Sequence, residues 1–198
     1  MKTLILYVHG KGGSANECGH YAPLFSGCDV RGLDYSGDTP WDAGKEIKEA
    51  ILKLSPKYEK ITLIANSIGA FFSMHAGIED LINDAYFISP IVDMESLILG
   101  MMEREGVTDD ELKRRGVIHT QSGDELSWEY LFFVREHPLK WSVPTKILYG
   151  ERDLLTPYGA VLRFADERGA SLTVMPGGEH WFHTEEQMCF LDAWIKSN

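Results

Sequence analysis

The feature that most constrains the fold of this chain is the run KITLIANSIGAFFSM, residues 60–74. Residues 61–65 are apolar and partly β-branched, which predicts a short buried strand. The apolar residues after Gly69 predict a buried helix that begins almost at once. A strand that turns into a helix through small-x-Ser-x-small tolerates only small neighbours, and it exposes the hydroxyl of its serine at a strained turn. Ala65 and Gly69 hold the two small positions around Ser67.

A serine at a strand-to-helix turn is often only part of a connection, so the rest of the chain must decide its role. A serine hydroxyl is a weak nucleophile unless a histidine accepts its proton and an acid orients the histidine. Asp153 follows a predicted strand at 145–149, and His180 follows another at 171–175. Ligands bind beyond these carboxyl ends in open α/β sheets. Alone, Asp153 would be a turn or cap residue and His180 a solvated loop residue, but their order after Ser67 favours a catalytic triad.

Other residues compete for these roles. Asp93 follows the predicted strand at 85–89 and is the main alternative for the acid. The loop that begins at Gly150 and the downstream Pro157 favour Asp153 instead. The remaining histidines are expected in structural or solvated positions: His9, His20, His75, His119, His137 and His183.

A glycine-rich loop follows the first apolar run. Residues 3–8 predict a strand, and HGKGGS occupies residues 9–14. Glycines allow a tight turn in which backbone N–H groups point into a cavity. Two such donors aimed at a developing negative oxygen stabilise the transition state of acyl transfer. The candidates are the backbone N–H groups of Lys11 and Ile68. The Gly-x-x-x-x-Gly-Lys-Ser/Thr spacing of a phosphate loop is absent, which disfavours nucleotide binding.

The segments HGKGGS, ANSIGA, GERDLLTP and GGEHWF, in this order, resemble the α/β-hydrolase superfamily, and in particular its small single-domain serine hydrolases. The resemblance covers nearly the whole chain. It implies that Ser67 is the nucleophile, His180 the base and Asp153 the acid, with Lys11 and Ile68 as the oxyanion donors. Ala65 stands where the family usually has glycine. The motifs do not define the substrate, because this superfamily contains esterases, thioesterases, lipases, peptidases, haloperoxidases and non-enzymes.

The alternation of predicted strands and helices indicates an α/β fold with about six mainly parallel strands and helices on both faces. The expected strands are residues 3–8, 29–33, 61–65, 85–89, 145–149 and 171–175. The expected helices lie within residues 16–25, 41–53, 69–76, 158–168 and 185–196. We expect a single domain over residues 1–198. Because the chain begins on the strand before the glycine loop, we expect it to lack the two antiparallel edge strands of larger superfamily members.

The stretch between the fourth and fifth predicted strands is too long for a plain crossover. The superfamily inserts a cap at this place, so we expect a small helical cap at about 91–143. Thr108 has the sequence context of a helix N-cap, and residues 127–135 predict a further helix. Apolar side chains here either line an acyl pocket or only pack the cap. The predicted substrate-binding residues are Met101, Trp128, Phe132 and, from the histidine loop, Trp181.

The formal charge of −11 argues against nucleic acid as a partner and disfavours anionic membranes and strongly anionic substrates. The first apolar run is too short for the core of a signal peptide, and no run approaches the ~18 apolar residues of a membrane span. Three cysteines without CxxC spacing predict free thiols in a reducing, cytoplasmic compartment. No cluster has metal-ligand spacing, so we expect neither a metal nor another cofactor.

Together these patterns predict an enzyme that hydrolyses a small-molecule carboxylic ester or thioester through an acyl-enzyme. One alternative is a non-catalytic module that binds a small ligand or a protein on the same fold, although four intact motifs argue against it. Another is a peptidase or perhydrolase that uses the same triad. The oligomeric state and the acyl chain length are not predicted by the sequence.

Overall fold

A computed structural model describes residues 2–121 and 123–198 of the chain. The described chain divides into two compact units. The second unit is Asp93–Leu139, and the remainder of the chain on both sides of it forms the first. The second unit falls within the stretch 91–143, where the sequence predicts an insertion. The assignment of the chain as one domain with a cap stays a prediction.

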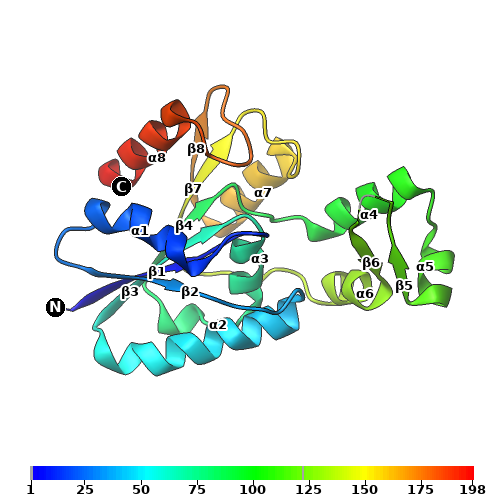
Figure 1. The fold of residues 1–198 in the computed structure, drawn as a ribbon, viewed down its shortest axis with the longest axis horizontal. Helices are drawn as coiled ribbons and strands as arrows, with labels where there is room; N and C mark the ends of the chain where they lie inside the picture. The colour runs from blue at the N-terminus through cyan, green and yellow to red at the C-terminus, as the bar shows by residue number, and fades with distance from the viewer. Residues whose placement is uncertain (1, 122) are drawn as a thin grey trace. The chain divides into compact units, whose positions relative to one another are not determined.

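The first unit contains a six-stranded sheet with the strand order β2-β1-β3-β4-β7-β8 (Figure 1). Every neighbouring pair in this sheet is parallel, so the carboxyl ends of all its strands lie along one edge. The sequence predicts each strand to within one residue at either end. The strands are β1 (Thr3–Val8), β2 (Asp29–Leu33), β3 (Lys60–Asn66), β4 (Asp84–Ile88), β7 (Thr145–Gly150) and β8 (Ser171–Met175).

Helices cover both faces of this sheet (Figure 1). The helices α1 (Cys18–Tyr21) and α8 (Glu185–Ser197) pack on one face, and α2 (Pro40–Leu54) and α3 (Ile68–His75) lie on the other. The central strands are apolar almost throughout, as expected for strands that are buried on both sides. Short 3-10 turns occupy Ala15–Glu17, Ala22–Leu24, Ser55–Lys57 and Glu79–Leu81.

The ends of the helices follow from capping residues. The hydroxyl of Thr39 accepts a hydrogen bond from the backbone N–H of Asp42 at the start of α2. The helix α7 (Tyr158–Arg168) ends at Gly169, whose φ of 64° lies in the left-handed region that glycine adopts without strain. Both α2 and α7 therefore begin and end close to where their sequences predict.

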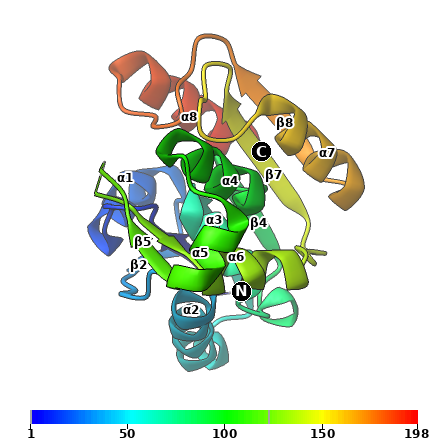
Figure 2. The same cartoon turned by 90° about the vertical axis from the view of Figure 1, so that its right-hand side faces the viewer.

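The described residues of the second unit form three helices, α4 (Met94–Glu105), α5 (Asp109–Arg115) and α6 (Trp128–Glu136) (Figure 2). It also contains an antiparallel pair, β5 (Val117–His119) and β6 (Glu125–Ser127), which the expectation of a helical cap omitted. Strands of three residues are too short to display an alternating pattern. Thr108 caps α5 as predicted, because its hydroxyl accepts the backbone N–H of Glu111 at 3.2 Å.

Within the part of the chain that the structure describes, no helix combines the length and the apolar character needed to cross a membrane.

Candidate active site

Ser67 lies between β3 and α3 in a backbone conformation that is rare for a residue with a side chain. Its φ is 51° and its ψ is −121°. Among the described residues, Ser89 is the only other non-glycine residue with a positive φ. The neighbouring β4 segment holds the turn, since the N–H of Ser67 donates to the carbonyl of Ile88 at 3.0 Å and the N–H of Ile91 donates to the carbonyl of Ser67 at 3.2 Å. Such backbone strain persists only where the surrounding structure enforces it, and it is common at active sites.

Gly69 is required by the close packing of α3 on the end of β1. A Cβ atom at this position would lie 2.3 Å from the carbonyl oxygen of His9 and 2.9 Å from that of Val8. These two oxygens explain why the serine turn tolerates only a small residue at position 69. Ala65, which replaces the usual glycine on the other side of the turn, is fully buried and its methyl group is accommodated.

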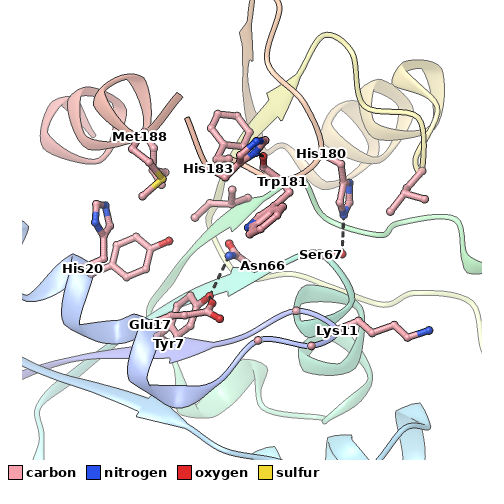
Figure 3. A pocket seen from close by; sticks show the side chains of 18 residues that line it. Tyr7, Lys11, Glu17, His20, Asn66, Ser67, His180, Trp181, His183 and Met188 are labelled. Atoms are coloured by element: carbon pink, nitrogen blue, oxygen red, sulfur yellow. Dashed lines mark hydrogen bonds between the residues drawn. The ribbon is translucent and has the colours of Figure 1, made fainter. Parts of the chain in front are cut away.

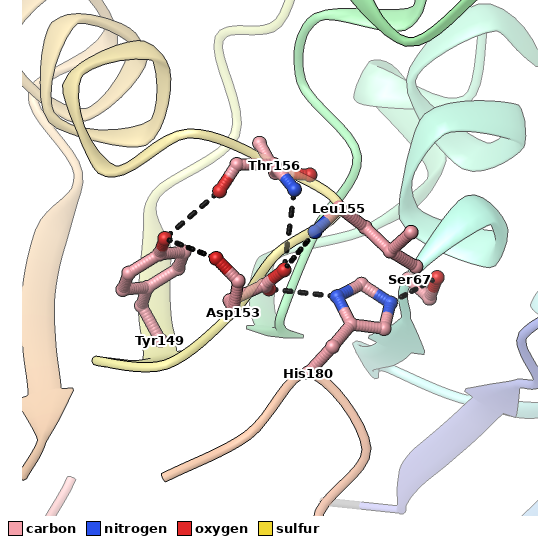
Figure 4. Close-up of polar contacts among 6 residues, drawn as sticks. All are labelled: Ser67, Tyr149, Asp153, Leu155, Thr156 and His180. Atoms are coloured by element: carbon pink, nitrogen blue, oxygen red, sulfur yellow. Dashed lines mark hydrogen bonds and ion pairs between the residues drawn. The ribbon is translucent and has the colours of Figure 1, made fainter. Parts of the chain in front are cut away.

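Three predicted residues from separate loops meet beside this turn (Figure 4). The Oγ of Ser67 lies 2.8 Å from Nε2 of His180, and Nδ1 of His180 lies 2.7 Å from Oδ2 of Asp153. The side chain of Asp153 is fully buried. Its Oδ1 accepts hydrogen bonds from the backbone N–H groups of Leu155 and Thr156 at 2.8 and 3.2 Å. Because a carboxylate only accepts hydrogen bonds, it favours a proton on Nδ1 and leaves the Nε2 lone pair facing the serine.

Tyr149 supports the loop that carries Asp153. Its hydroxyl donates to the carbonyl oxygen of Thr156 at 2.8 Å, and the carbonyl of Asp153 lies 3.4 Å away (Figure 4). Burial raises the pKa of Tyr149 to about 12, so the phenol remains a neutral donor over the physiological range.

The loops of the acid and the histidine touch backbone to backbone. A Cβ atom on Gly150 would lie 2.4 Å from the carbonyl oxygen of Glu179 and 2.7 Å from that of Gly178. The N–H of Arg152 donates to the carbonyl of Gly178 at 2.7 Å. Asp153 and His180 therefore lie on loops that follow the adjacent strands β7 and β8 and that pack directly against each other.

The alternative acid, Asp93, is the N-cap residue of α4. Its carboxylate caps α4, where it accepts hydrogen bonds from the backbone N–H and the hydroxyl of Ser96 at 3.0 and 2.8 Å. This is the ordinary role of an aspartate in front of a helix. The ring of His180 contacts the carboxylate of Asp153.

The glycine-rich loop approaches the serine turn. A Cβ atom on Gly10 would lie 3.2 Å from the Cβ of Ser67, and the loop closes through the N–H of Gly13 and the carbonyl of Gly10 at 3.1 Å. Lys11 lines the same pocket as Ser67, but its side chain extends away from the serine (Figure 3). Ile68 is the first residue of α3, where a backbone N–H has no partner within the helix. The role of both N–H groups as oxyanion donors stays a prediction.

His9 has contacts that suit a structural role. It is buried, its Nδ1 lies 2.8 Å from the carbonyl oxygen of Gly10, and its ring stacks on Tyr35 with centroids 4.3 Å apart. The hydroxyl of Tyr35 donates to the carbonyl of His9 at 2.9 Å. These contacts hold the start of the glycine loop in place.

A pocket of about 700 Å³ opens beside Ser67 and His180 (Figure 3). Trp181 lines it, as predicted for a substrate-binding residue, and remains 72% exposed. The other predicted binding residues, Met101, Trp128 and Phe132, belong to α4 and α6 of the second unit. Their role as substrate-binding residues stays a prediction.

Several lining residues were not among the predicted site residues. They come from β1, the first turns after the glycine loop, the residue before the serine, and α8: Tyr7, Glu17, His20, Tyr21, Asn66 and Met188. Of these residues, only Asn66 could have been predicted from a local pattern, because it adjoins Ser67. The others reach the pocket through the order of strands in the sheet, which short motifs do not encode. Among the described residues, no group of three or more histidine, cysteine or acidic side chains could hold a metal ion.

No family model matches this chain, and no curated protein matches it. Solved structures do. Est1E from Butyrivibrio proteoclasticus is 20% identical over 99% of this chain and 86% of its own, with a TM-score of 0.74. Alpha/beta hydrolase domain-containing protein 10 from mouse is 17% identical over 98% of this chain and 88% of its own, with a TM-score of 0.73. The thioesterase domain from the curacin biosynthetic pathway is 14% identical over 98% of this chain and 91% of its own, with a TM-score of 0.61.

These likenesses establish the fold. The chain has the α/β-hydrolase fold, as its four sequence motifs imply.

Proposed function

We propose that this chain is a serine hydrolase that cleaves a carboxylic ester or thioester through an acyl-enzyme. The observation that carries the proposal is the continuous chain of contacts from Ser67 Oγ through the ring of His180 to the buried carboxylate of Asp153, at 2.8 and 2.7 Å. A serine, a base and an orienting acid in this arrangement are what nucleophilic acyl transfer requires.

In the first half-reaction, Nε2 of His180 accepts the hydroxyl proton while Oγ of Ser67 attacks the carbonyl carbon. Asp153 holds the imidazole in orientation and stabilises the imidazolium that forms. The backbone N–H groups of Lys11 and Ile68 donate to the oxygen that becomes negative. The tetrahedral intermediate then collapses as His180 returns the proton to the leaving alcohol or thiol, which departs and leaves the acyl group on Ser67.

In the second half-reaction, water attacks the acyl-enzyme. His180 takes a proton from the water and gives it to Oγ of Ser67, so that the free acid leaves and the serine is restored. The pocket of about 700 Å³ is within the size range of small-molecule sites, which supports a small-molecule substrate. The thioesterase domain among the structural relatives supports hydrolysis as the reaction class, and does not distinguish ester from thioester.

The test combines turnover with covalent labelling. We expect hydrolysis of p-nitrophenyl acetate, butyrate or octanoate, or of an acyl-CoA, by the unmodified protein and none above background by Ser67→Ala. A fluorophosphonate should label the unmodified protein and not Ser67→Ala. Ser55→Ala, which alters a half-buried serine at the end of α2, serves as the matched control and should keep both signals.

Labelling that persists in Ser67→Ala would refute the assignment of the nucleophile. An absence of both turnover and labelling would favour a non-catalytic binding module. Hydrolysis of peptides but not esters would assign the same triad to a peptidase. From the odd number of cysteines we propose, in addition, that the protein acts in the reducing environment of the cytoplasm.

A further inference from the structure

A buried side-chain amide reaches the loop that carries His180 from the helix that follows it. Gln187 lies in the first turn of α8, and its side chain is buried. Its Oε1 accepts the backbone N–H of His183 at 3.0 Å. Its Nε2 donates to Oε2 of Glu179 at 3.5 Å. We call these two hydrogen bonds the Gln187 bridge. They end on residues that lie on either side of His180 in the sequence.

The orientation of this amide is fixed by its partners. A backbone N–H only donates and a carboxylate only accepts, so the oxygen of the amide faces His183 and its nitrogen faces Glu179. A buried amide that lost either partner would leave a polar atom without a hydrogen bond, which is costly. The bridge therefore favours one arrangement of residues 179–183 over others that are equally compact.

The bridge departs from the contact that the start of α8 would supply by itself. The run TEEQ, residues 184–187, has the pattern of a capping box, in which the side chain of the fourth residue accepts the N–H of the first. Half of that motif is present, because the hydroxyl of Thr184 accepts the N–H of Gln187 at 3.2 Å. The Oε1 of Gln187, however, accepts the N–H of His183, one residue earlier in the chain. The side chain thus holds the histidine loop in addition to its own helix.

The two halves of the histidine loop are held by different means. Before His180, the backbone packs on the loop of Asp153, where the carbonyl of Gly178 accepts the N–H of Arg152 at 2.7 Å. After His180, Phe182 is buried in the core. Burial of an apolar ring has no direction, so it does not set the rotation of the backbone around it. The bridge supplies a directional contact to this second half.

The reaction tolerates little movement of this loop. Nδ1 and Nε2 of His180 lie at hydrogen-bond distance from Asp153 and Ser67 at the same time, at 2.7 and 2.8 Å (Figure 4). A displacement of about 1 Å can lower the rate of a catalysed step by about 10²-fold. Because His180 lies within the bridged segment, a rotation of residues 179–183 would move its ring relative to both partners.

We propose that Gln187 is a positioning residue for His180: its amide holds residues 179–183 in the backbone arrangement that places the imidazole between Ser67 and Asp153. Gln187 acts on the reaction only through His180. The inference rests on the proposed hydrolase function and adds a residue to the machinery of that site.

The kinetic test compares two changes at the start of the same helix. Gln187→Met keeps the length of the side chain and removes both hydrogen bonds, so kcat for p-nitrophenyl butyrate should fall about tenfold while KM stays within about twofold. Thr184→Ala is the matched control, since it removes the hydroxyl that caps α8 and leaves the amide in place. It should lower the midpoint of urea unfolding and keep kcat within about twofold. An equal loss of kcat in both variants, or an unchanged kcat in Gln187→Met, would overturn the proposal.

An exchange of the two side chains tests the bridge directly. Gln187→Glu keeps an oxygen for the N–H of His183 but places a second carboxylate beside Glu179, so kcat should fall severalfold. Adding Glu179→Gln restores a donor that faces an acceptor, and kcat should return to within about twofold of the wild type. Failure of the second change to restore kcat would overturn the proposal. These variants keep a polar side chain at position 187, so they decide the question even if Gln187→Met does not fold.

Nuclear magnetic resonance keeps this test separate from the test of catalysis. Long-range proton–nitrogen correlation spectra of protein with isotopically labelled histidine show which ring nitrogen carries the proton. The neutral ring of His180 should carry it on Nδ1 in the wild type and in Thr184→Ala. In Gln187→Met the proton should be shared between both nitrogens, because the ring no longer faces Asp153 throughout. This result without ester turnover would uphold the positioning role and refute the hydrolase. Identical His180 signals in all three proteins would refute the positioning role even if esters were hydrolysed.

Discussion

The two oxygens of the Asp153 carboxylate have different partners: Oδ2 lies 2.7 Å from Nδ1 of His180, whereas Oδ1 accepts two backbone N–H groups. In Asp153→Asn the amide oxygen can keep the backbone bonds, and the amide NH2 then faces His180. An NH2 donor shifts the ring proton to Nε2, where it faces the serine and prevents proton abstraction. We expect kcat for p-nitrophenyl butyrate to fall by about 10³-fold or more.

The control for this change is Asp93→Asn, at the helix cap of α4. It should retain kcat within about twofold and lose at most about 1 kcal/mol of stability. A loss of activity in Asp93→Asn as large as in Asp153→Asn would contradict the assignment of the acid.

Gly69→Ala should destabilise the protein, because the new Cβ atom would lie 2.3 Å from the carbonyl oxygen of His9. Overpacking against backbone costs about 1–3 kcal/mol, and here it also displaces the serine turn, so activity should fall as well. The midpoint of urea unfolding measures the first effect. Gly159→Ala in α7 is the counterpart, since its Cβ meets only the end of Arg163 at 3.8 Å. It should leave stability unchanged or raise it by up to about 1 kcal/mol.

Alkaline pH should destabilise the fold through its buried tyrosines. The pKa of Tyr149 is raised from 10.0 to about 12, and burial also raises the pKa values of Tyr7, Tyr21 and Tyr35. Between these two pH values the unfolded chain loses the proton of Tyr149 while the folded chain keeps it. The stabilisation is therefore complete below pH 10 and is lost as the pH rises towards 12.

Urea midpoints measured on either side of this window give the loss directly. In Tyr149→Phe the residue at position 149 has no group that titrates. The urea midpoint of this variant should therefore fall less steeply with pH than that of the wild type. Parallel slopes for the wild type and Tyr149→Phe would exclude this contribution.

Trp181→Ala should act on substrate binding more than on the chemical step. The indole lines the pocket next to His180 and takes no part in the proton transfers. Loss of its contact surface should raise KM for p-nitrophenyl octanoate roughly fivefold and leave kcat within about twofold. Leu154→Ala removes a residue that is 95% exposed and lies outside the pocket, and should change neither constant. A lower kcat with unaltered KM in Trp181→Ala would instead indicate that the indole positions His180.

Local patterns predict most of this fold because its strands are short apolar runs between clear breakers. Ser67, Asp153 and His180 could be named from the sequence for the same reason: each follows a strand of one parallel sheet, and such strands end at a common edge. The pair β5 and β6 was missed because each strand has only three residues.

The pocket wall formed by Tyr7, Glu17 and Asn66 escaped prediction for a different reason. Tyr7 and Asn66 converge because β1 and β3 are neighbours in the sheet, with Tyr7 paired in register with Ile64. Glu17 joins them through a short turn whose position no helical or strand period describes. Contacts of this kind depend on the tertiary arrangement of several elements, whereas the triad depends only on where each strand stops.

The contact between the loops of Gly150 and Gly178 has a consequence for how this protein can change. Because the two loops pack backbone against backbone, the distance between Asp153 and His180 is set by the fact that β7 and β8 are neighbours in the sheet. The wall that holds Glu17 is built by β1, β3 and the turn after the glycine loop, on a different part of the sheet. This part of the pocket and the loops of Asp153 and His180 are therefore built by different strands, and a laboratory that changes Tyr7 or Glu17 should be able to leave the contact between Asp153 and His180 untouched.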